Sequence, residues 1–124
     1  DWVIATGKTT TVRDFIKMCF AHAGIELEFK GEGSNERGYI KSCTNSEYQL
    51  KIGQEVVVVD EKYYRPTEVE LLIGDATKAK EKLGWVPEYD LDALVLDMMT
   101  SDIELMKKQQ YLKDAGYRIK NYFE

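Results

Sequence analysis

The residues best suited to chemistry are Arg65 and Glu68, which lie on either side of Pro66-Thr67. Pro66 restricts Arg65 to extended backbone geometry, so the arginine belongs to an irregular segment rather than to a helix. A guanidinium presents a planar fork of donors that matches two phosphate oxygens. If the segment brings Glu68 alongside, its carboxylate can accept from two adjacent hydroxyls, as on a ribose. The two side chains outline a site for a nucleotide sugar.

The same pair has a simpler interpretation. An Arg65–Glu68 ion pair within the loop, exposed to water, would contribute little and bind nothing. These residues alone leave both interpretations open. Four aromatic residues are candidates to stack on a base: Tyr63, Tyr64, Trp85 and Tyr89. Ordinary packing is the alternative for them, and it is preferred for Trp85.

Several other chemistries lack their residues. The chain has no P-loop pattern and no Gly-x-Gly-x-x-Gly after a predicted strand. His22 is the only histidine, which excludes a histidine-based metal cluster, and its place near a predicted helix end favours a structural or surface role. The glycines at 31 and 33 belong to a loop without the following helix that a phosphate site uses. No catalytic, cofactor-binding or metal-ligating residue is predicted.

Composition restricts the class of partner. The 124 residues, 44% of them hydrophobic, suit a single domain over residues 1–124. The net charge of −5 and the absence of a basic block argue against nucleic acid. No apolar run approaches the ~20 residues of a membrane span. Cys19 and Cys43 follow no metal or disulfide pattern, which predicts a reduced, cytoplasmic setting.

Strands and helices are expected to alternate along the chain. Short strands are predicted at 2–5, 25–29, 56–59 and 71–73, the valine run 56–59 being covered on both faces. Helices are predicted from residue 12 to Gly24, from Asp75 to Leu83 and from Asp90 onward. Residues 31–45 are predicted to form a loop. The expected class is α/β, of an α+β-like kind with few short strands and three main helices.

Four short strands are too few for a complete doubly wound sheet. The chain also starts with Asp1 and passes at once into a predicted strand. We therefore expect this sequence to be part of a larger protein.

Three stretches resemble the C-terminal signature of the extended short-chain dehydrogenases that act on nucleotide sugars: Arg65 to Val69, Gly74 to Lys80, and Leu83 to Pro87. The common form of that signature is Arg-Pro-Gly-Asp, then Asp-x-x-Lys-Ala, then Leu-Gly-Trp-x-Pro. Here Thr67 replaces the glycine and Glu68 the aspartate.

Those departures narrow the resemblance to the GDP-mannose 4,6-dehydratase family, as do Val3 to Gly7 and Thr11 to Phe15. The family usually has Ser-Val-Arg-Glu-Phe in the second stretch, so Thr11 and Asp14 depart mildly from it. The resemblance covers most of residues 1–106 and is weak at 31–54.

The resemblance implies conversion of GDP-mannose to GDP-4-keto-6-deoxymannose, a lyase step towards GDP-fucose-type sugars. It implies NADP bound by an N-terminal Rossmann domain absent from this chain, and a homo-oligomeric whole enzyme. The catalytic Tyr-x-x-x-Lys pair is missing, since neither Tyr39 nor Tyr48 has a lysine four residues on. This chain alone is therefore expected to be inactive. Arg65 corresponds to the arginine on the diphosphate and Glu68 to the carboxylate on the nucleotide. Arg13 matches a family position without an assigned role.

Two other functions remain open. One is an epimerase or dehydratase of the same superfamily acting on another nucleotide sugar. The other is a non-catalytic nucleotide-binding or interaction module. The sequence Pro-Thr-Glu-Val at residues 66–69 favours GDP-mannose as the substrate over another nucleotide sugar.

Overall fold

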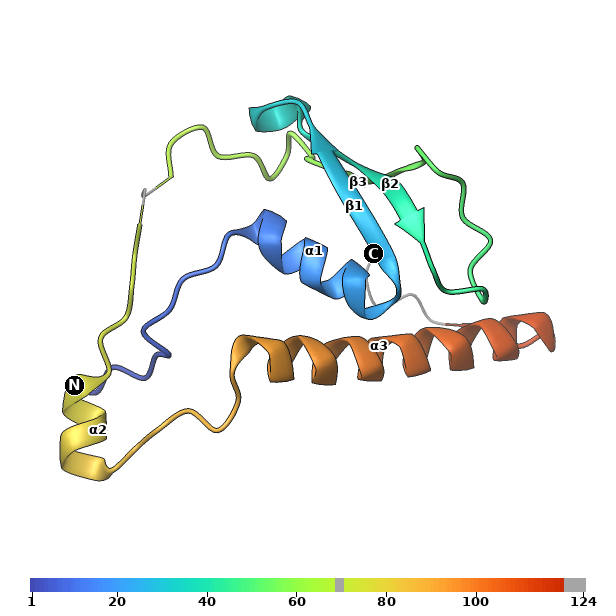
Figure 1. Ribbon diagram of the computed structural model, residues 1–124. Helices are drawn as coiled ribbons and strands as arrows, with labels where there is room; N and C mark the ends of the chain where they lie inside the picture. Colours follow the sequence, from blue (N-terminus) through green and yellow to red (C-terminus); the bar gives the residue numbers. More distant parts are fainter. Residues whose placement is uncertain (69–70, 120–124) are drawn as a thin grey trace.

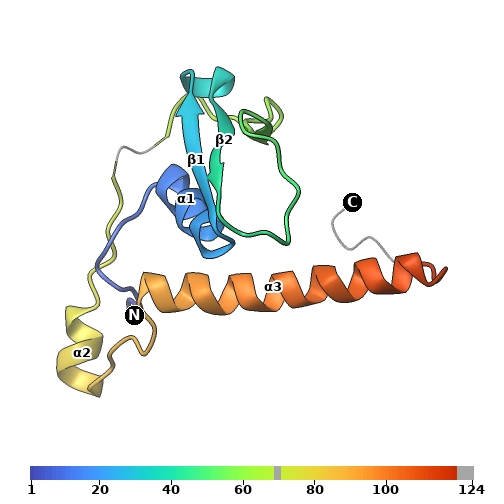
Figure 2. The same ribbon diagram turned by 45° about the vertical axis from the view of Figure 1, so that its right-hand side comes forward.

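The protein has three layers in a computed structural model that describes residues 1–68 and 71–119. Helix α1 (Val12–His22) lies between an antiparallel sheet and the long helix α3 (Leu91–Asp114), as Figures 1 and 2 show. Helix α2 (Thr77–Leu83) lies apart from the sheet, near the start of α3. The mixed α and β class with three helices and few strands is confirmed, and the antiparallel pairing gives it its α+β-like character.

The sheet has the strand order β1-β2-β3. Strand β1 (Ile25–Lys30) pairs antiparallel with β2 (Arg37–Cys43), and β2 pairs antiparallel with β3 (Glu55–Val58). A short 3-10 turn, η1 (Gly33–Asn35), joins β1 to β2. Because β2 is the middle strand, its hydrogen bonds fix the positions of both edge strands, and so of the connections that follow them.

The core lies between the sheet and α1. Ile25 and Leu27 alternate with exposed residues on β1, as predicted, and Ile40 of β2 is 1% exposed. Residues from α1 and its C-terminal end, from all three strands and from the β2–β3 connection pack against this cluster: Ile16, Phe20, Ala23, Phe29, Cys43, Tyr48, Leu50, Val56 and Val57. On α3, Val95 is buried. The apolar face of α1 thus serves both neighbouring layers.

The helix ends follow the predicted capping chemistry. The Thr11 hydroxyl accepts from the Asp14 backbone N–H at 3.1 Å, and the Asp90 carboxylate accepts from that of Ala93 at 2.8 Å. Gly84 ends α2 with φ +65°, a conformation that glycine adopts without strain. These caps explain why α1 and α3 begin where the sequence predicts.

The prediction of a loop over residues 31–45 is wrong, because β2 occupies half of it. Gly38 lies where a Cβ atom would stand 2.9 Å from Cβ of Val57 and 3.1 Å from a ring atom of Phe29. Glycine is therefore needed there for close strand packing rather than for a turn. The polar side chains of Lys41 and Ser42 also have partners within the sheet. The Lys41 ammonium and the Ser42 hydroxyl both donate to the Glu26 carboxylate on the neighbouring strand.

The predicted strands at 2–5 and 71–73 are also wrong. Both segments are extended without strand pairing, and their apolar side chains are exposed. Among the described residues they have no partner strand, and hydrogen-bond pairing is what a strand requires. The valine strand is confirmed as β3, but its expected cover on both faces is wrong, since Val58 is 56% exposed. β3 is an edge strand.

We predict that Ile40→Ala destabilises the protein by roughly 2–5 kcal/mol, because it leaves a cavity among Ile25, Leu27 and α1. Urea unfolding measures this as a lower transition midpoint. Ile52→Ala is the matched control, since Ile52 is 68% exposed. Equal effects of both substitutions would contradict a core centred on Ile40.

Cys19 gives a second prediction, about the α1–α3 layer. Burial raises the pKa of its thiol, and the nearby Asp102 carboxylate of α3 raises it further. The rate of Cys19 alkylation, followed by mass spectrometry, should therefore rise with pH later than that of an ordinary cysteine. Asp102→Asn should move the inflection of the rate–pH curve only part of the way back to that of an ordinary cysteine, because burial is the larger cause of the raised pKa. An inflection at or below the ordinary pKa would refute this packing.

Candidate functional site

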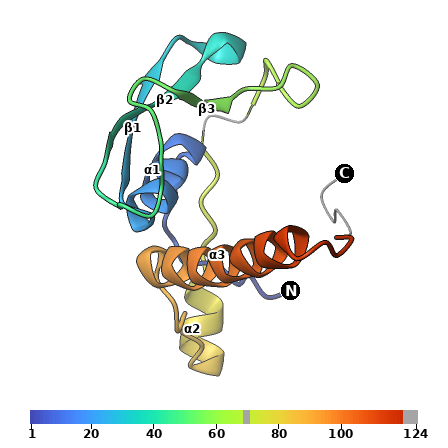
Figure 3. The same cartoon turned by 90° about the vertical axis from the view of Figure 1, so that its right-hand side faces the viewer.

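The predicted site lies in the connection that follows β3. The Asp60 carbonyl accepts from the backbone N–H of Tyr63 at 3.0 Å and of Tyr64 at 3.1 Å. The Asp60 carboxylate accepts from the N–H of Lys62 at 2.9 Å. This turn ends the strand and sends the chain beside the sheet, where Figure 3 shows the loop standing out from the layers. Arg65 and Pro66 continue it in irregular backbone.

The structure brings Arg65 and Glu68 together. Nη1 of Arg65 lies 3.9 Å from Oε1 of Glu68, and the two side chains are 79% and 61% exposed. The intraloop ion pair is therefore formed, and at this exposure it contributes at most about 1 kcal/mol to stability. A planar guanidinium engaged through one nitrogen still presents donors along its other edge. Val69, the last residue of this signature stretch, lies outside the described residues.

The four candidate aromatic residues are not gathered at one place. Tyr63 is exposed, and the Lys62 ammonium stands 5.2 Å from its ring centroid. Tyr64 lies against the η1 turn through its hydroxyl. Trp85 and Tyr89 belong to the connection between α2 and α3, away from the β3 loop (Figure 1). Trp85 is half-buried there, which fits the packing role preferred for it. Only the two tyrosines adjoin Arg65.

The second signature stretch shapes the start of α2. The Asp75 carboxylate accepts from the Thr77 hydroxyl and, at 2.9 Å, from the Thr77 backbone N–H. These hydrogen bonds lower the pKa of Asp75. Ala79 is completely buried on the helix. The prediction that Asp75 caps this helix is wrong, because the N-cap is Ala76 and Asp75 instead accepts from Thr77, the first residue of the helix.

The N-terminal segment packs beside this turn. The Lys78 ammonium donates to the Asp1 carbonyl at 3.0 Å and stands 4.6 Å from the Trp2 ring centroid. A Cβ atom at Gly74 would meet that of Ala5 at 2.4 Å, so the two backbones approach as only glycine allows. The structure thus gives the residues of this signature stretch a role in packing and in forming the turn before α2.

Arg13 has a contact that the sequence could not reveal. Its Nε donates to Oε1 of Glu36 at 2.5 Å, and the Glu36 side chain is only 18% exposed. The hydrogen bond to Glu36, together with its charge, raises the pKa of Arg13. The two residues lie on α1 and just after η1, with β1 between them in sequence. No local spacing rule connects them, which is why sequence reasoning left Arg13 without a role.

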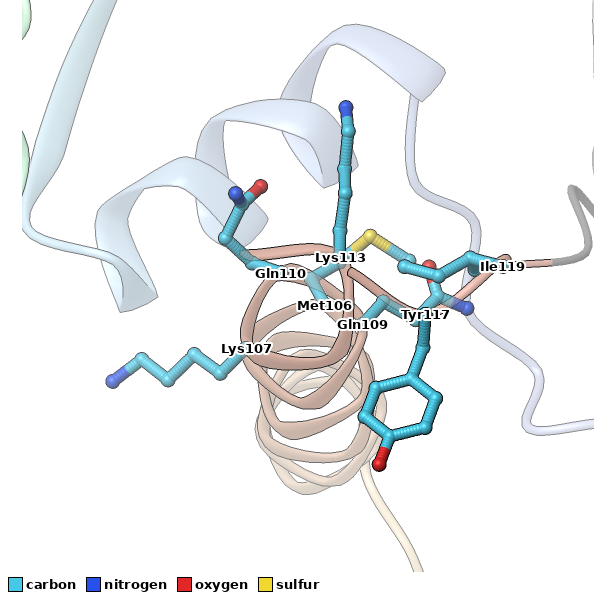
Figure 4. Close-up of a pocket in the computed structure, with 7 residues that line it drawn as sticks. All are labelled: Met106, Lys107, Gln109, Gln110, Lys113, Tyr117 and Ile119. Carbon is cyan, nitrogen blue, oxygen red and sulfur yellow. The ribbon is translucent and has the colours of Figure 1, made fainter. Parts of the chain in front are cut away.

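A separate hollow lies at the far end of α3 (Figure 4). It is formed by the last turns of the helix together with Tyr117 and Ile119. Figures 1 and 2 place this end of α3 on the opposite side of the molecule from the β3 loop. The hollow is therefore unrelated to Arg65 and Glu68.

Metal sites, dinucleotide sites and membrane spans each require a particular geometry. Among residues 1–68 and 71–119, no three His, Cys, Asp or Glu side chains gather as metal ligands. In the same residues the sheet is antiparallel, and no glycine-rich turn leads from a strand into a helix, so these residues do not fit a dinucleotide cofactor. No helix in the part of the chain described here has the length and apolar character to cross a bilayer.

Known proteins match this chain closely. Residues 1–98 match the family described as GDP-mannose 4,6 dehydratase. A GDP-mannose 4,6-dehydratase of Yersinia enterocolitica is 46% identical over 121 residues, which are 96% of this chain and 32% of that protein. One from Vibrio cholerae is 45% identical over 96% of this chain and 32% of its own. The human one is 45% identical over 86% and 26%. The chain spans about a third of the length of these curated relatives.

Proposed function

Because this chain belongs to the GDP-mannose 4,6-dehydratase family, we propose that it is the GDP-sugar-binding part of such an enzyme. The enzyme would be a lyase of nucleotide-sugar metabolism that converts GDP-mannose to GDP-4-keto-6-deoxymannose. The observation that carries the proposal is the exposed Arg65–Glu68 pair, held side by side at 3.9 Å on the loop after β3. It brings a phosphate-binding cation and a hydroxyl-binding carboxylate to one point.

Arg65 is the proposed diphosphate ligand. Its side chain is 79% exposed, so a ligand can approach the guanidinium without first displacing protein. The exposed ion pair with Glu68 is weak, so it leaves the guanidinium available to a ligand. The edge turned away from Glu68 can then donate to two oxygens of a diphosphate.

Glu68 is the proposed contact to the ribose. A carboxylate has acceptor sites on both oxygens, so one oxygen can face Arg65 while the other accepts from a hydroxyl. Together the two residues would hold the nucleotide while the sugar reaches the reacting groups. Binding energy from the nucleotide is then used to position the sugar, so losing it should affect turnover as well as affinity.

The reacting groups and NADP belong, in this proposal, to a separate N-terminal Rossmann domain. Two observations support this division. The described residues do not fit a dinucleotide, and the matched relatives are about three times as long as the chain. The exposed apolar segments at 2–4 and 71–73 are the proposed surface on which that domain docks.

Two further properties follow from the family and are proposed with it. The whole enzyme would be a homo-oligomer and would work in the cytoplasm. Both cysteines, Cys19 and Cys43, are free thiols in the structure, as a reducing compartment requires.

The activity is tested on the whole natural protein that carries this chain. With NADP supplied, we expect a 4-keto-6-deoxy sugar from GDP-mannose and none from UDP- or dTDP-sugars, with products identified by NMR. Turnover of a different nucleotide sugar would overturn the substrate while keeping the enzyme class. Failure to turn over any of them would favour a binding or interaction module.

The same protein tests the two ligands. Arg65→Ala should weaken GDP binding roughly 10- to 100-fold in calorimetry, as expected for the loss of a charged hydrogen bond. Arg65→Lys should fall between, because it keeps the charge but loses the fork. The unfolding midpoint should barely change, since the ion pair is exposed.

Glu68→Gln separates the roles of the two residues. It should weaken binding of GDP but leave the affinity for inorganic pyrophosphate, which has no ribose, unchanged. Equal losses for both ligands would show that Glu68 acts only through Arg65.

A further inference from the structure

Three contacts in series connect Arg13 of α1 with Tyr64, the residue before Arg65. They run from Arg13 to Glu36, through the turn that joins β1 to β2, and from Gly33 to the Tyr64 ring. None of these residues belongs to the ion pair of the proposed site. The first and last contacts join segments that are distant in sequence, so the series ties the β3 loop to the body of the protein.

The first contact anchors the turn to the helix. Arg13 donates to the mostly buried carboxylate of Glu36, and its guanidinium also stands 6.0 Å from the Phe29 ring centroid. Phe29 packs against the core cluster. Arg13 thus lies between the Glu36 carboxylate and the Phe29 ring, and both contacts favour its position over the turn.

The second link is the rigidity of the turn, residues 31–36. Asn35 donates to the Glu32 carbonyl at 3.1 Å and Glu36 to the Gly33 carbonyl at 3.3 Å. The Arg37 guanidinium donates to the carbonyls of Ser34 and Glu36, both at 2.8 Å. These hydrogen bonds, two within the turn and two from the neighbouring Arg37, restrict its backbone.

Gly33 makes the third contact, and Gly31 allows the turn itself to close. At Gly31, with φ +88°, a Cβ atom would stand 2.4 Å from the Asn35 carbonyl oxygen. At Gly33, with φ +58°, it would stand 3.0 Å from the hydroxyl and 3.7 Å from the ring carbon of Tyr64. The Tyr64 hydroxyl therefore lies close to bare backbone, and a side chain at position 33 would require it to shift by a few tenths of an ångström.

We propose that the turn 31–36, anchored by Arg13 through Glu36, is a support that positions Tyr64 and with it Arg65. The inference rests on the proposed role of Arg65 in diphosphate binding. Arg13, Glu36 and Gly33 are positioning residues, because they act on the ligand only through the β3 loop. Tyr64 is bonded directly to Arg65, and Pro66 restricts Arg65 from the other side. If the Tyr64 backbone moves together with its ring, the arginine moves as well.

The main test compares two glycines in the whole natural protein. Gly33→Ala adds a methyl group against Tyr64, whereas Gly53→Ala adds one at φ +82° with nothing within 4 Å. Both substitutions strain the backbone in the same way. We expect both to lower the unfolding midpoint, and only Gly33→Ala to weaken GDP binding, by about tenfold.

A second pair of variants tests the contact itself. Tyr64→Phe removes the hydroxyl, and the nearest remaining ring atom is 3.7 Å from the added methyl group. Gly33→Ala combined with Tyr64→Phe should therefore recover most of the lost affinity for GDP, while the backbone strain remains. Absence of recovery would overturn the contact as the cause.

Arg13 is tested by charge. Arg13→Gln should weaken GDP binding to about the extent of Gly33→Ala, and Arg13→Lys should restore part of it. Measuring Arg65→Ala alongside distinguishes failure of the proposed support from failure of the proposed function. If Arg65→Ala leaves GDP binding unchanged, the proposed function fails. If Arg65→Ala weakens binding but Gly33→Ala matches Gly53→Ala, the support fails while the proposed function stands.

Discussion

The fold depends on β2 lying in the middle of the sheet with Ile40 buried beneath it. At 1% exposure, Ile40 joins Ile25 and Leu27 in the core that α1 covers. Pairing on both sides of β2 fixes the register of β1 and β3, and so the place where each connection leaves the sheet. The turn 31–36 and the loop that carries Arg65 emerge from these strands. Apolar burial in one layer thus decides where polar side chains meet outside it.

The site itself is held by weak forces. An exposed ion pair such as Arg65–Glu68 adds little to stability, which leaves both groups available to a ligand. Precision must then come from the surrounding backbone, and the contact of Gly33 with Tyr64 is the means that we infer. Binding residues commonly lie on loops whose position is fixed by a rigid scaffold.

The family signature divides by physical role. The stretch around Asp75 and Lys78 forms the turn that leads into α2 and holds the N-terminal segment, and Gly74 allows the close approach to Ala5. Arg65 and Glu68 have no comparable structural duty, because they are exposed and their pair is weak. That contrast is a physical reason for assigning binding to one stretch and architecture to the other.

Local chemistry in the sequence determined the helices and the candidate pair. Caps at Thr11 and Asp90 and the glycine at 84 act within a few residues, so they could be identified without a fold. Pro66 likewise restricts Arg65 locally, and the pair was found side by side. What the pair binds stays a prediction.

Tertiary structure decided what depends on distant partners. β2 was missed because its glycine and polar residues resemble a loop until β1 and β3 lie beside it. Residues 2–5 and 71–73 have strand-like sequences, but a strand exists only where another strand pairs with it. The contact between Arg13 and Glu36 joins positions that only the packing of α1 on the sheet brings together. Sequence patterns report local preference, whereas pairing and burial are properties of the whole chain.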